Sequence, residues 1–295
     1  MSEVIQNVSD TSIWVAHYRA LETKLPEPLF KDPFAGILVG DRAPSMESIK
    51  SRVANFTSWV VVIRTCIIDQ MIADLVSKGV TAFLNVGAGL DSRPYRMSLD
   101  PRLRWIEVDF PHVIDYKRKR LEQYKPNCEL QSIGLDLSDR SSRQSLLAEI
   151  ARNNPKVAVL TEGVLPYLAE EQVTELSRDL NRHPSFEYWI CEYFSPKAYR
   201  YLKDPKRMKV LKNAPFRFYP ENWTNYFQGL GWRLAQLQYY AEVSEVLGRP
   251  TPMPPLFKLF ELILGKQWAA PLKRMSGFMI WERDDTGSIG IADKG

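Results

Sequence analysis

Acidic side chains follow several short apolar runs of this chain, an arrangement typical of a ligand site. Asp109 follows the run 103–108, Asp136 lies beyond the next run, and Glu162 lies just after residues 157–160. In open α/β sheets, ligands bind beyond the carboxyl ends of the strands, where such side chains would meet. Each carboxylate alone is more often a helix cap or a surface charge, but together they predict a shared binding site.

A glycine-containing turn precedes these acids. The apolar run 82–86 ends in Gly87, Ala88 and Gly89, and two glycines allow the backbone to turn sharply and to approach a ligand closely. The dinucleotide-binding pattern G-x-G-x-x-G requires a third glycine where this chain has Ser92. The turn alone is therefore weak evidence, and an ordinary strand-to-helix turn is the alternative.

Two acids could bind the ribose of a nucleotide ligand. Glu107 and Asp109 lie about twenty residues after the glycines, where an acidic side chain accepts hydrogen bonds from ribose hydroxyls. Both lie on the same face of the expected strand, because side chains alternate with a period of two. We favour Asp109, which is nearer the carboxyl end.

The negative charge of this acid cluster narrows the class of ligand that can bind there. A dinucleotide carries a negative pyrophosphate, which clustered carboxylates would repel. S-adenosylmethionine has a ribose, an adenine, an ammonium group and a sulfonium, and only one carboxylate. It therefore matches several acids and one cation better than a dinucleotide does.

Arg64 is the candidate cation for that carboxylate. A helix is expected over residues 56–78, and Arg64 lies on its apolar stripe with Val60, Ile68 and Met71. An arginine on such a stripe needs a partner, and its planar guanidinium binds a carboxylate bidentately. A structural ion pair with a nearby Asp or Glu is the alternative.

The elements that must position these residues alternate regularly between strand-like and helix-like patterns. Apolar runs predict strands at residues 82–86, 103–108, 129–133, 157–160, 188–191, 232–240 and 277–282, and helical patterns occupy residues 113–124, 142–152 and 170–180. This alternation indicates βαβ units and a mainly parallel sheet covered by helices on both faces. The last two strands are expected to form a terminal antiparallel pair.

We predict a single domain over residues 1–295. Its parts are a helical N-terminal cover (1–80, with Ser45 or Ser48 as a helix cap), a cofactor-binding core (81–195), cap insertions with the last two strands (196–283) and a flexible tail (284–295). Gly79 should end the helix of residues 56–78. A proline-rich stretch at 250–255 and an apolar helix at 256–264 are interpreted as an insertion over the sheet edge.

Composition excludes several classes of function. The chain has 295 residues with a net charge of +4, and the basic run 117–120 lacks the interleaved aromatic residues that a nucleic-acid site would need. We interpret that run as a solvated helix face. The three cysteines and three histidines are isolated, so neither a metal site nor a disulfide is expected. Charged residues interrupt the apolar runs too soon for a membrane span.

The N-terminus lacks the pattern of a secretory signal, so a cytoplasmic location is expected. The mild positive charge suits a small anionic substrate, whereas the sequence leaves the oligomeric state and the substrate's identity open.

The motifs of this chain resemble those of the leucine carboxyl methyltransferase family, whose bacterial members include carboxyl O-methyltransferases of polyketide biosynthesis. The main resemblance lies in segments 86–93, 107–111, 135–137 and 161–167, with shorter matches at 18–20, 32–34, 63–69 and 231–250. It covers most of residues 12–283. The heptad GAGLDSR in its strand-to-helix context is the most specific part.

This resemblance implies a Rossmann-like class I methyltransferase fold, with a helical N-terminal cover, a cap over the substrate and S-adenosylmethionine as cofactor. The cofactor-binding residues implied by motif are Arg64 at the methionine carboxylate, Gly87 with Ala88, Gly89 and Asp91 at the glycine turn, Asp109 at the ribose, Asp136 and Leu137 at the adenine, and Glu162 in the pocket wall. Tyr167 would face the substrate, with Tyr18 and Arg19 as looser candidates there. The family's early cofactor-binding lysine does not align, and the C-terminal third matches poorly outside Gly231-Trp232.

The predicted reaction is methyl transfer to a carboxylate in line with the C–S bond of the cofactor. Alignment of two bound reactants supplies about 7–11 kcal/mol of barrier reduction. A carboxylate is ionised at pH 7 and needs no general base. Tyr167, with Arg19 or Arg217, would orient the acid.

Two functions other than carboxyl methylation also fit the sequence. A hydroxyl or phenol acceptor would require a base, for which His17 and His112 are the candidates. The chain could instead bind S-adenosylmethionine without catalysis, in which case its aromatic segments 193–194, 216–219 and 223–227 would form a partner interface rather than a lid.

Overall fold

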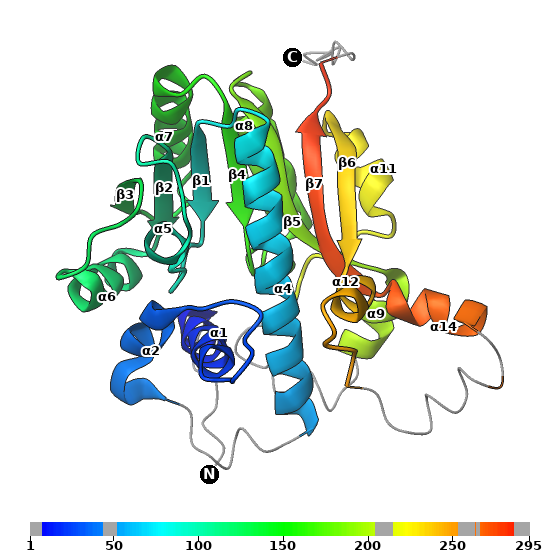
Figure 1. Ribbon diagram of the computed structural model, residues 1–295. Coiled ribbons are helices and arrows are strands. Elements are labelled where there is room, and N and C mark those ends of the chain that lie inside the picture. Colours follow the sequence, from blue (N-terminus) through cyan, green and yellow to red (C-terminus); the bar gives the residue numbers. More distant parts are fainter. Residues whose placement is uncertain (1–7, 44–51, 204–214, 253–262, 264–265, 286–295) are drawn as a thin grey trace.

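A mixed seven-stranded sheet forms the centre of the computed structural model, which describes residues 8–43, 52–203, 215–252, 263 and 266–285. The sheet order is β3-β2-β1-β4-β5-β7-β6. The strands are β1 (Ala82–Val86), β2 (Arg104–Asp109), β3 (Glu129–Gly134), β4 (Val157–Thr161), β5 (Phe186–Phe194), β6 (Trp232–Tyr239) and β7 (Ser276–Arg283). Figure 1 shows the first five strands running in one direction.

The strand order reverses between β1 and β4. The chain proceeds outward from β1 through β2 to β3, all parallel, and then returns to add β4 and β5 on the other side of β1. Strand β7 pairs antiparallel with both β5 and β6, which confirms the predicted terminal antiparallel pair. The reversal creates the switch point at which open α/β sheets bind ligands.

Helices cover both faces of this sheet, as predicted. The helices are α1 (Val8–Thr23), α2 (Pro33–Val39), α4 (Arg52–Ser77), α5 (Arg93–Arg96), α6 (Pro111–Leu121), α7 (Arg140–Asn153), α8 (Glu170–Asn181), α9 (Pro196–Leu202), α11 (Trp223–Gln228), α12 (Tyr240–Val246) and α14 (Lys266–Lys273), with 3-10 turns η1 (Gly40–Arg42) and η2 (Leu165–Tyr167). The long helix α4 crosses one face together with α12, while α7, α8 and α11 cover the other (Figure 1).

Strand alternation divides the core between these two layers. On β1, Leu84 packs in the cluster of α7 and α8, whereas its neighbour Phe83 packs in the cluster of α4. On β5, Trp189 and Ile190 divide in the same way. A sheet buried on both faces therefore has continuous apolar strands rather than alternating ones.

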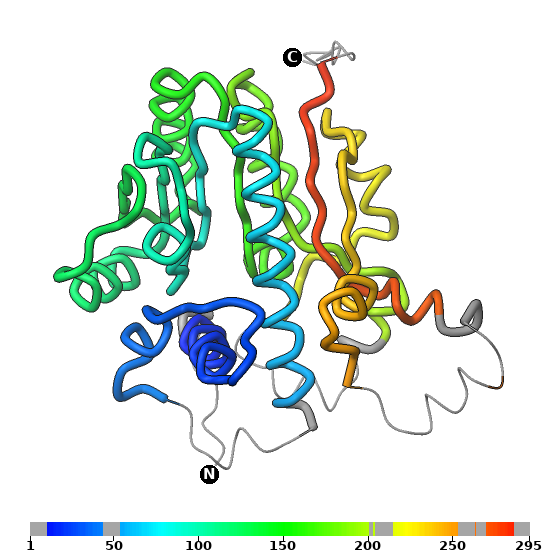
Figure 2. Tube along the Cα trace, viewed as in Figure 1, coloured from blue at the N-terminus to red at the C-terminus, as the bar shows by residue number. Residues whose placement is uncertain are grey.

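The N-terminal helices α1 and α2 lie below the carboxyl ends of the parallel strands (Figure 2). A small cluster that includes Ala16, Leu38 and Leu90 fills the space between them and the sheet edge. Asp32 caps α2 by accepting a hydrogen bond from the amide of Ala35. The predicted N-terminal cover thus contacts the edge of the sheet where the ligand site is expected.

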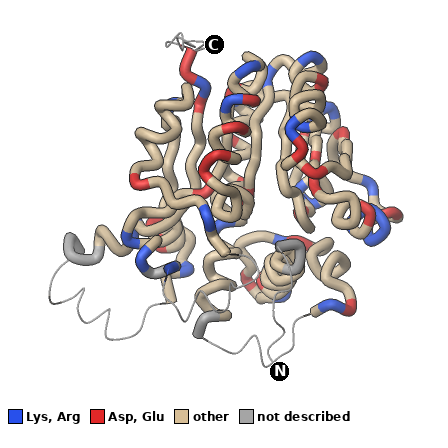
Figure 3. The backbone as a smooth tube through the Cα atoms, turned by 180° about the vertical axis from the view of Figure 1, so that it is seen from behind, with Lys and Arg blue, Asp and Glu red and all other residues tan. Residues whose placement is uncertain are grey.

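The basic run on α6 is less solvated than predicted. Lys117 is buried and forms an ion pair with Glu107, and the guanidinium of Arg120 donates to the carbonyl of Ile37. Because α6 packs between β2, β3 and α2, part of the run points into the protein. Figure 3 shows basic and acidic residues interspersed along the backbone.

The predicted elements agree closely with the observed ones. Helix α4 begins at Arg52 instead of residue 56, and Gly79 beyond its end has a φ of 84°. Ser45, Ser48, most of the predicted insertion helix 256–264 and the tail from residue 286 lie outside the described residues. Helix α12, which precedes the predicted insertion, packs against α4, β6 and β7. Among described helices, none has the length and apolar character needed to cross a bilayer.

Candidate functional site

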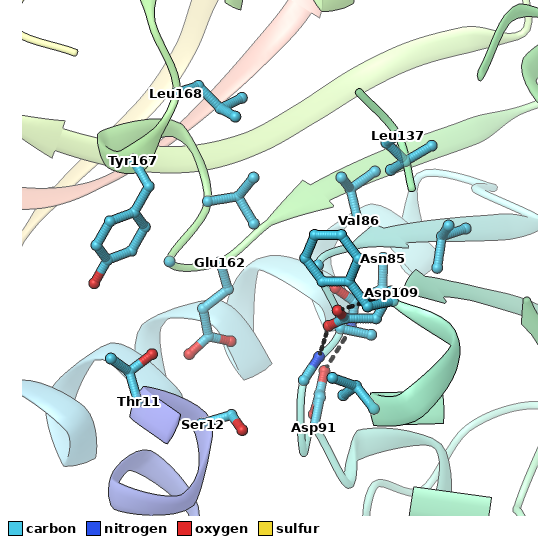
Figure 4. A pocket seen from close by; sticks show the side chains of 18 of the residues that line it. Thr11, Ser12, Asn85, Val86, Asp91, Asp109, Leu137, Glu162, Tyr167 and Leu168 are labelled. Carbon is cyan, nitrogen blue, oxygen red and sulfur yellow. Dashed lines mark hydrogen bonds between the residues drawn. The ribbon is translucent and has the colours of Figure 1, made fainter. Parts of the chain in front are cut away.

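A cavity of about 540 Å³ opens at the carboxyl ends of β1, β2 and β4. Its walls come from the turns after β1 to β4, from the start of α8 and from α1. This is the switch point of the sheet, where a ligand site was predicted. Figure 4 shows the acids of the cavity among a mixture of polar and apolar side chains.

The glycine turn lies in the wall of this cavity. Gly87 and Gly89 have φ values of 64° and 49°, a region that residues with a Cβ rarely adopt. A Cβ on Gly87 would lie 2.5 Å from the side chain of Val164, and one on Gly89 would lie 3.2 Å from the Cβ of Ser12. The two glycines thus allow neighbouring segments to close on the turn.

Asp109, not Glu107, reaches the cavity. One carboxylate oxygen of Asp109 accepts from the Gly89 amide and the other from the Phe110 amide, both at 2.7 Å. Glu107, also on β2, is buried outside the cavity, where it binds Lys117 of α6 and the hydroxyl of Ser132 of β3. Of the two acids, Asp109 is therefore the one placed to meet a ligand, and its role at the ribose stays a prediction.

The predicted adenine-side residues, Asp136 and Leu137, both line the cavity. Asp136 accepts from the amide of Ser138 at 2.9 Å. The carbonyl of Leu137 accepts from Arg143 at 2.8 Å, and Arg143 is itself paired with Asp179 at 2.8 Å. The turn after β3 is thereby fixed by a buried cation.

Arg143 was not among the predicted residues, although a signal was present. It lies three and four residues before Leu146 and Leu147 on α7, which places an arginine on the apolar stripe of a helix. The same pattern singled out Arg64.

Arg64 and Glu162 form an ion pair at the cavity wall. Arg64 Nε lies 2.8 Å from Glu162 Oε1, and Glu162 Oε2 lies 2.7 Å from Arg93 Nη1. The structural ion pair that was the alternative for Arg64 is therefore present, but both partners also line the cavity. The role of Arg64 at the methionine carboxylate stays a prediction.

Arg93 links three carboxylates behind the glycine turn. Its side chain has no exposed surface, and besides Glu162 it contacts Asp91 at 3.0 Å and Asp69 at 2.7 Å. Arg96 joins the same cluster through Asp69 at 2.6 Å. The cavity wall therefore rests on a buried network of alternating charges.

This network keeps its acids ionised. Burial alone would raise the pKa of Glu162, but the guanidinium groups of Arg93 and Arg64 hold it below its ordinary value. Burial alone would also raise the pKa of Asp91. The positive charges of Arg93, Lys117 and Arg19 instead hold the pKa of that carboxyl well below its usual range. Both carboxylates are negative at neutral pH.

The substrate-side candidates fall in different places. Tyr167 lines the cavity at the end of η2, with its ring edge-on to Phe216 at 5.1 Å. Arg19 also lines it, but its guanidinium donates to the carbonyl of Leu90 at 2.6 Å and lies 3.3 Å from Asp32. Tyr18 is 2% exposed and is not among the described lining residues. Arg217 is among the residues that line the cavity.

Glu192, at the end of β5, is a further acid that the sequence analysis missed. It is 2% exposed, one of its oxygens accepts from the amide of Gly163, and the other has no hydrogen-bond partner among the described residues. Burial raises the pKa of Glu192 to about 7. The signal was an acid directly after the apolar run 188–191.

Fold and site together define a class: a Rossmann-like α/β protein with a ligand cavity at the switch point of its sheet. Two solved structures share this fold. A DUF574 family protein from Streptomyces avermitilis aligns with a TM-score of 0.57 and 14% identity, over 91% of this chain and 96% of that one. A provisionally named methyltransferase from Thermobifida fusca aligns with a TM-score of 0.54 and 16% identity, over 96% of each chain.

The chain belongs to the leucine carboxyl methyltransferase family, whose model matches residues 12–181. Relatives provisionally named S-adenosyl-L-methionine-dependent methyltransferases occur in Mycobacterium avium, at 28% identity, and in Mycobacterium marinum, at 30% identity. Both alignments cover 84% of this chain and 87% of the relative. The resemblance of the motifs is confirmed, and S-adenosyl-L-methionine is the cofactor.

The residues at the cavity fit this cofactor. Asp109 offers a carboxylate for ribose hydroxyls, Arg64 a cation for the methionine carboxylate, and Leu137 an apolar surface for adenine. Asn85, at the end of β1, lines the cavity with a buried Oδ1 atom that has no hydrogen-bond partner among the described residues. None of the described lining residues is a lysine, so the family's early lysine has no counterpart there.

Proposed function

We propose that this methyltransferase transfers the methyl group to a carboxylate of a small organic acid, giving a methyl ester. The observation that carries the proposal is the set of groups around the acceptor side of the cavity. Arg217 and the hydroxyl of Tyr167 line the cavity and can hold an anion, whereas Arg64 and Arg19 are already paired with carboxylates of the chain. Neither His17 nor His112 is among the described lining residues.

Tyr167 is suited to orient such an acid. Burial raises the pKa of its phenol to about 12, so the hydroxyl stays protonated and is available as a donor at neutral pH. Figure 4 shows Tyr167 on the same side of the cavity as Glu162 and Thr11, away from Leu137. A donor at this place can hold one carboxylate oxygen while the other attacks.

The bound cofactor supplies an electrophilic sulfonium methyl group. An ionised acceptor oxygen forms the new O–C bond as the C–S bond breaks, and no proton has to be moved because the acceptor is already deprotonated. The residues of the chain hold the two reactants in line, which supplies about 7–11 kcal/mol. Arg64, Asp109 and Glu162 would fix the cofactor side, and Tyr167 the acceptor side.

The aromatic residues near Tyr167 support an acceptor with a flat apolar body. Phe216 contacts Tyr167 and also lies 6.0 Å from Phe194, measured between ring centres. By contrast, Trp223 and Phe227 are buried in the core beneath α11 and contribute nothing to an exposed interface. These core positions argue against a partner interface at Trp223 and Phe227 and equally against a lid there, so Phe216 beside Tyr167 is the lid candidate that is left.

The test is incubation with methyl-labelled cofactor and a panel of aromatic and aliphatic acids and phenols. A carboxyl acceptor gives a product whose label is released by mild base as methanol. A base-stable product, or a product formed only from phenols, would contradict the proposal. In the Tyr167→Phe variant we expect the KM for the acid to rise about tenfold, the value of one hydrogen bond to a charged group.

A hydroxyl acceptor is the second candidate, and Glu192 is the observation that favours it. Glu192 has a pKa of about 7 and lies behind Gly163, outside the described lining residues, so it would act as a base only through an intervening group. The pH profile separates the two functions. Methylation of a carboxylate would be flat between about pH 6 and 8, whereas a base with that pKa would make the rate rise through neutrality.

A further inference from the structure

One short turn carries groups for both sides of the cavity. The turn leaves β4 at Glu162 and ends at Tyr167, and both of these residues line the cavity. Between them, the side chain of Val164 lies so close to Gly87 that a Cβ on that glycine would be only 2.5 Å away. A shift of this turn would therefore move the cofactor-side acid and the acceptor-side hydroxyl relative to the glycine turn.

The side chain of Glu192 holds this turn from behind. The parallel ladder between β4 and β5 ends at the pair Thr161–Cys191, and Glu192 is the next residue of β5. Beyond that pair, the amide of Gly163 donates to the carboxyl group of Glu192. The side chain thus continues the contact between the two strands past the end of their backbone ladder.

An acid is a costly partner for a single amide at this place. Glu192 is 2% exposed, and its second carboxylate oxygen has no hydrogen-bond partner among the described residues. Burial of a polar group without its full set of hydrogen bonds opposes folding, so such a group calls for an explanation. Because Glu192 is not among the described lining residues, any role in the reaction has to pass through the turn.

We propose that Glu192 is a positioning residue for methyl transfer, acting through the amide of Gly163. By fixing the turn, it sets where the hydroxyl of Tyr167 lies relative to the cofactor beside Glu162. Alignment of this kind matters because a displacement of about 1 Å lowers a rate by as much as about a hundredfold. The inference rests on the acceptor side proposed for Tyr167, but it holds for a hydroxyl acceptor as well as for a carboxylate.

Cofactor binding should depend much less on Glu192. Glu162 has two guanidinium partners of its own, Arg64 at 2.8 Å and Arg93 at 2.7 Å, and neither contact involves Gly163. A loss of positioning should therefore lower turnover and leave the affinity for S-adenosylhomocysteine nearly unchanged.

The test uses two substitutions that separate the reach of the side chain from its charge. Glu192→Gln keeps the length and an oxygen that accepts from Gly163, but it does not ionise. Glu192→Asp keeps the carboxyl group and is one methylene shorter. With the acid or phenol of the panel above that is methylated fastest, Glu192→Gln should retain kcat within about twofold. Glu192→Asp should lower kcat about tenfold or more, as misaligned reactants do. By calorimetry, both variants should bind S-adenosylhomocysteine within about twofold of the parent.

Two further measurements complete the test. Glu187 is the matched control, because it lies near the other end of β5 and pairs with Lys156 at 3.1 Å. Glu187→Gln and Glu187→Asp should alter neither kcat nor the affinity. Without any acceptor, exchange of the Gly163 amide proton with solvent, followed by NMR, should be slow in the parent and in Glu192→Gln and faster in Glu192→Asp.

Four results would overturn the inference: full turnover in Glu192→Asp, a loss of turnover in Glu192→Gln, a loss of turnover in Glu192→Asp that is matched by an equal loss of affinity, or equal exchange of the Gly163 amide in all three proteins. None of these results depends on the chemistry of the product. A base-stable product would contradict carboxyl methylation and leave the role of Glu192 standing.

Discussion

The two walls of the cavity are built by different means. The strand-end wall consists of charged groups that satisfy one another in a buried network, centred on Arg93 and its three carboxylates. The cover wall consists of one face of α1, with hydroxyls at Thr11 and Ser12, and of the aromatic segment around Tyr167. The first wall is held by ion pairs within the protein. The second is held by packing of α1 against α2 and α4 and by the contacts of Arg19 with Asp32 and Leu90.

Because of this difference, we expect changes in the strand-end wall to affect the stability of the fold, and changes in the cover wall to affect ligand binding. A change in the strand-end wall leaves a buried charge unpaired, so it should lower the stability of the fold and the affinity for the cofactor together. A change in the cover wall removes a group that faces the ligand, so it should alter binding with little effect on folding.

The largest effect is expected for Arg93→Met. Removing the guanidinium leaves Asp69, Asp91 and Glu162 buried without their shared partner, which typically costs about 3–5 kcal/mol. The free energy of unfolding, measured in urea, should fall by that amount, and binding of S-adenosylhomocysteine should be lost. Arg102→Met is the matched control, because Arg102 pairs with Asp100 on the surface and is 88% exposed. An unchanged unfolding midpoint for the Arg93 variant would refute the idea that the network supports the wall.

A pair of glycine variants should give the next largest effect. Gly87→Ala forces a residue with a Cβ to φ 64° and into contact with Val164, whereas Gly163→Ala has a φ of 71° but open space around the new Cβ. Gly163→Ala should lower the free energy of unfolding by about 1–2 kcal/mol, because of the backbone conformation alone. Gly87→Ala should lower it by about 1–3 kcal/mol more, because the new Cβ overpacks against Val164. Equal costs in urea unfolding would mean that the approach of Val164 does not matter.

The sequence predicted the sheet well because each strand is a local pattern. Buried strands such as β1 and β4 are short and apolar from end to end, and the glycines and acids that follow them mark their carboxyl ends. The position of Asp109 at the cavity followed from the same local logic. These features depend on neighbours within a few residues.

The network and the cover could not be derived in the same way. Arg93 stands in the quoted heptad, but its partners Asp69 and Glu162 lie 24 and 69 residues away in the chain. Ser12 meets Gly89 only because α1 folds under the sheet edge. Such contacts arise from tertiary packing, which no periodicity in the sequence encodes. Arg143 and Glu192 did carry local signals, on a helical stripe and at a strand end, and were overlooked.

Asp109→Asn should have a smaller effect, on binding more than on folding. The asparagine keeps an oxygen for the amide of Gly89 but lacks the charge that strengthens hydrogen bonds from ribose hydroxyls. A hydrogen bond to a charged group contributes about 1.5–3 kcal/mol, so the Kd for S-adenosylhomocysteine should rise at least about tenfold. Asp115→Asn, on the exposed side of α6, is the control. Unaltered affinity would remove Asp109 from the ribose site.

The smallest expected effect concerns Glu192, which lies behind the strand-end wall. Its pKa of about 7 exceeds the ordinary value of 4.5 because the carboxyl is buried, with Arg64 of α4, Glu162 beyond β4 and Tyr240 of α12 around it. A raised pKa means that the folded protein keeps the proton longer than the unfolded chain. The stability that this proton provides is present in full below about pH 4.5 and is lost as the pH rises toward 7.

Glu192→Gln should therefore remove this pH dependence. The difference in unfolding free energy between variant and parent should shift in favour of the variant by about 1–2 kcal/mol between pH 5 and pH 8, measured in urea. A constant difference across that range would mean that Glu192 is already ionised at pH 5.

The same variant also tests the acceptor. If the enzyme methylates a carboxylate, the rate at saturating acid should change little, because no base is needed. A loss of turnover without a loss of cofactor binding would instead assign Glu192 as the base for a hydroxyl acceptor, and the strand-end wall would then take part in the reaction as well as in folding.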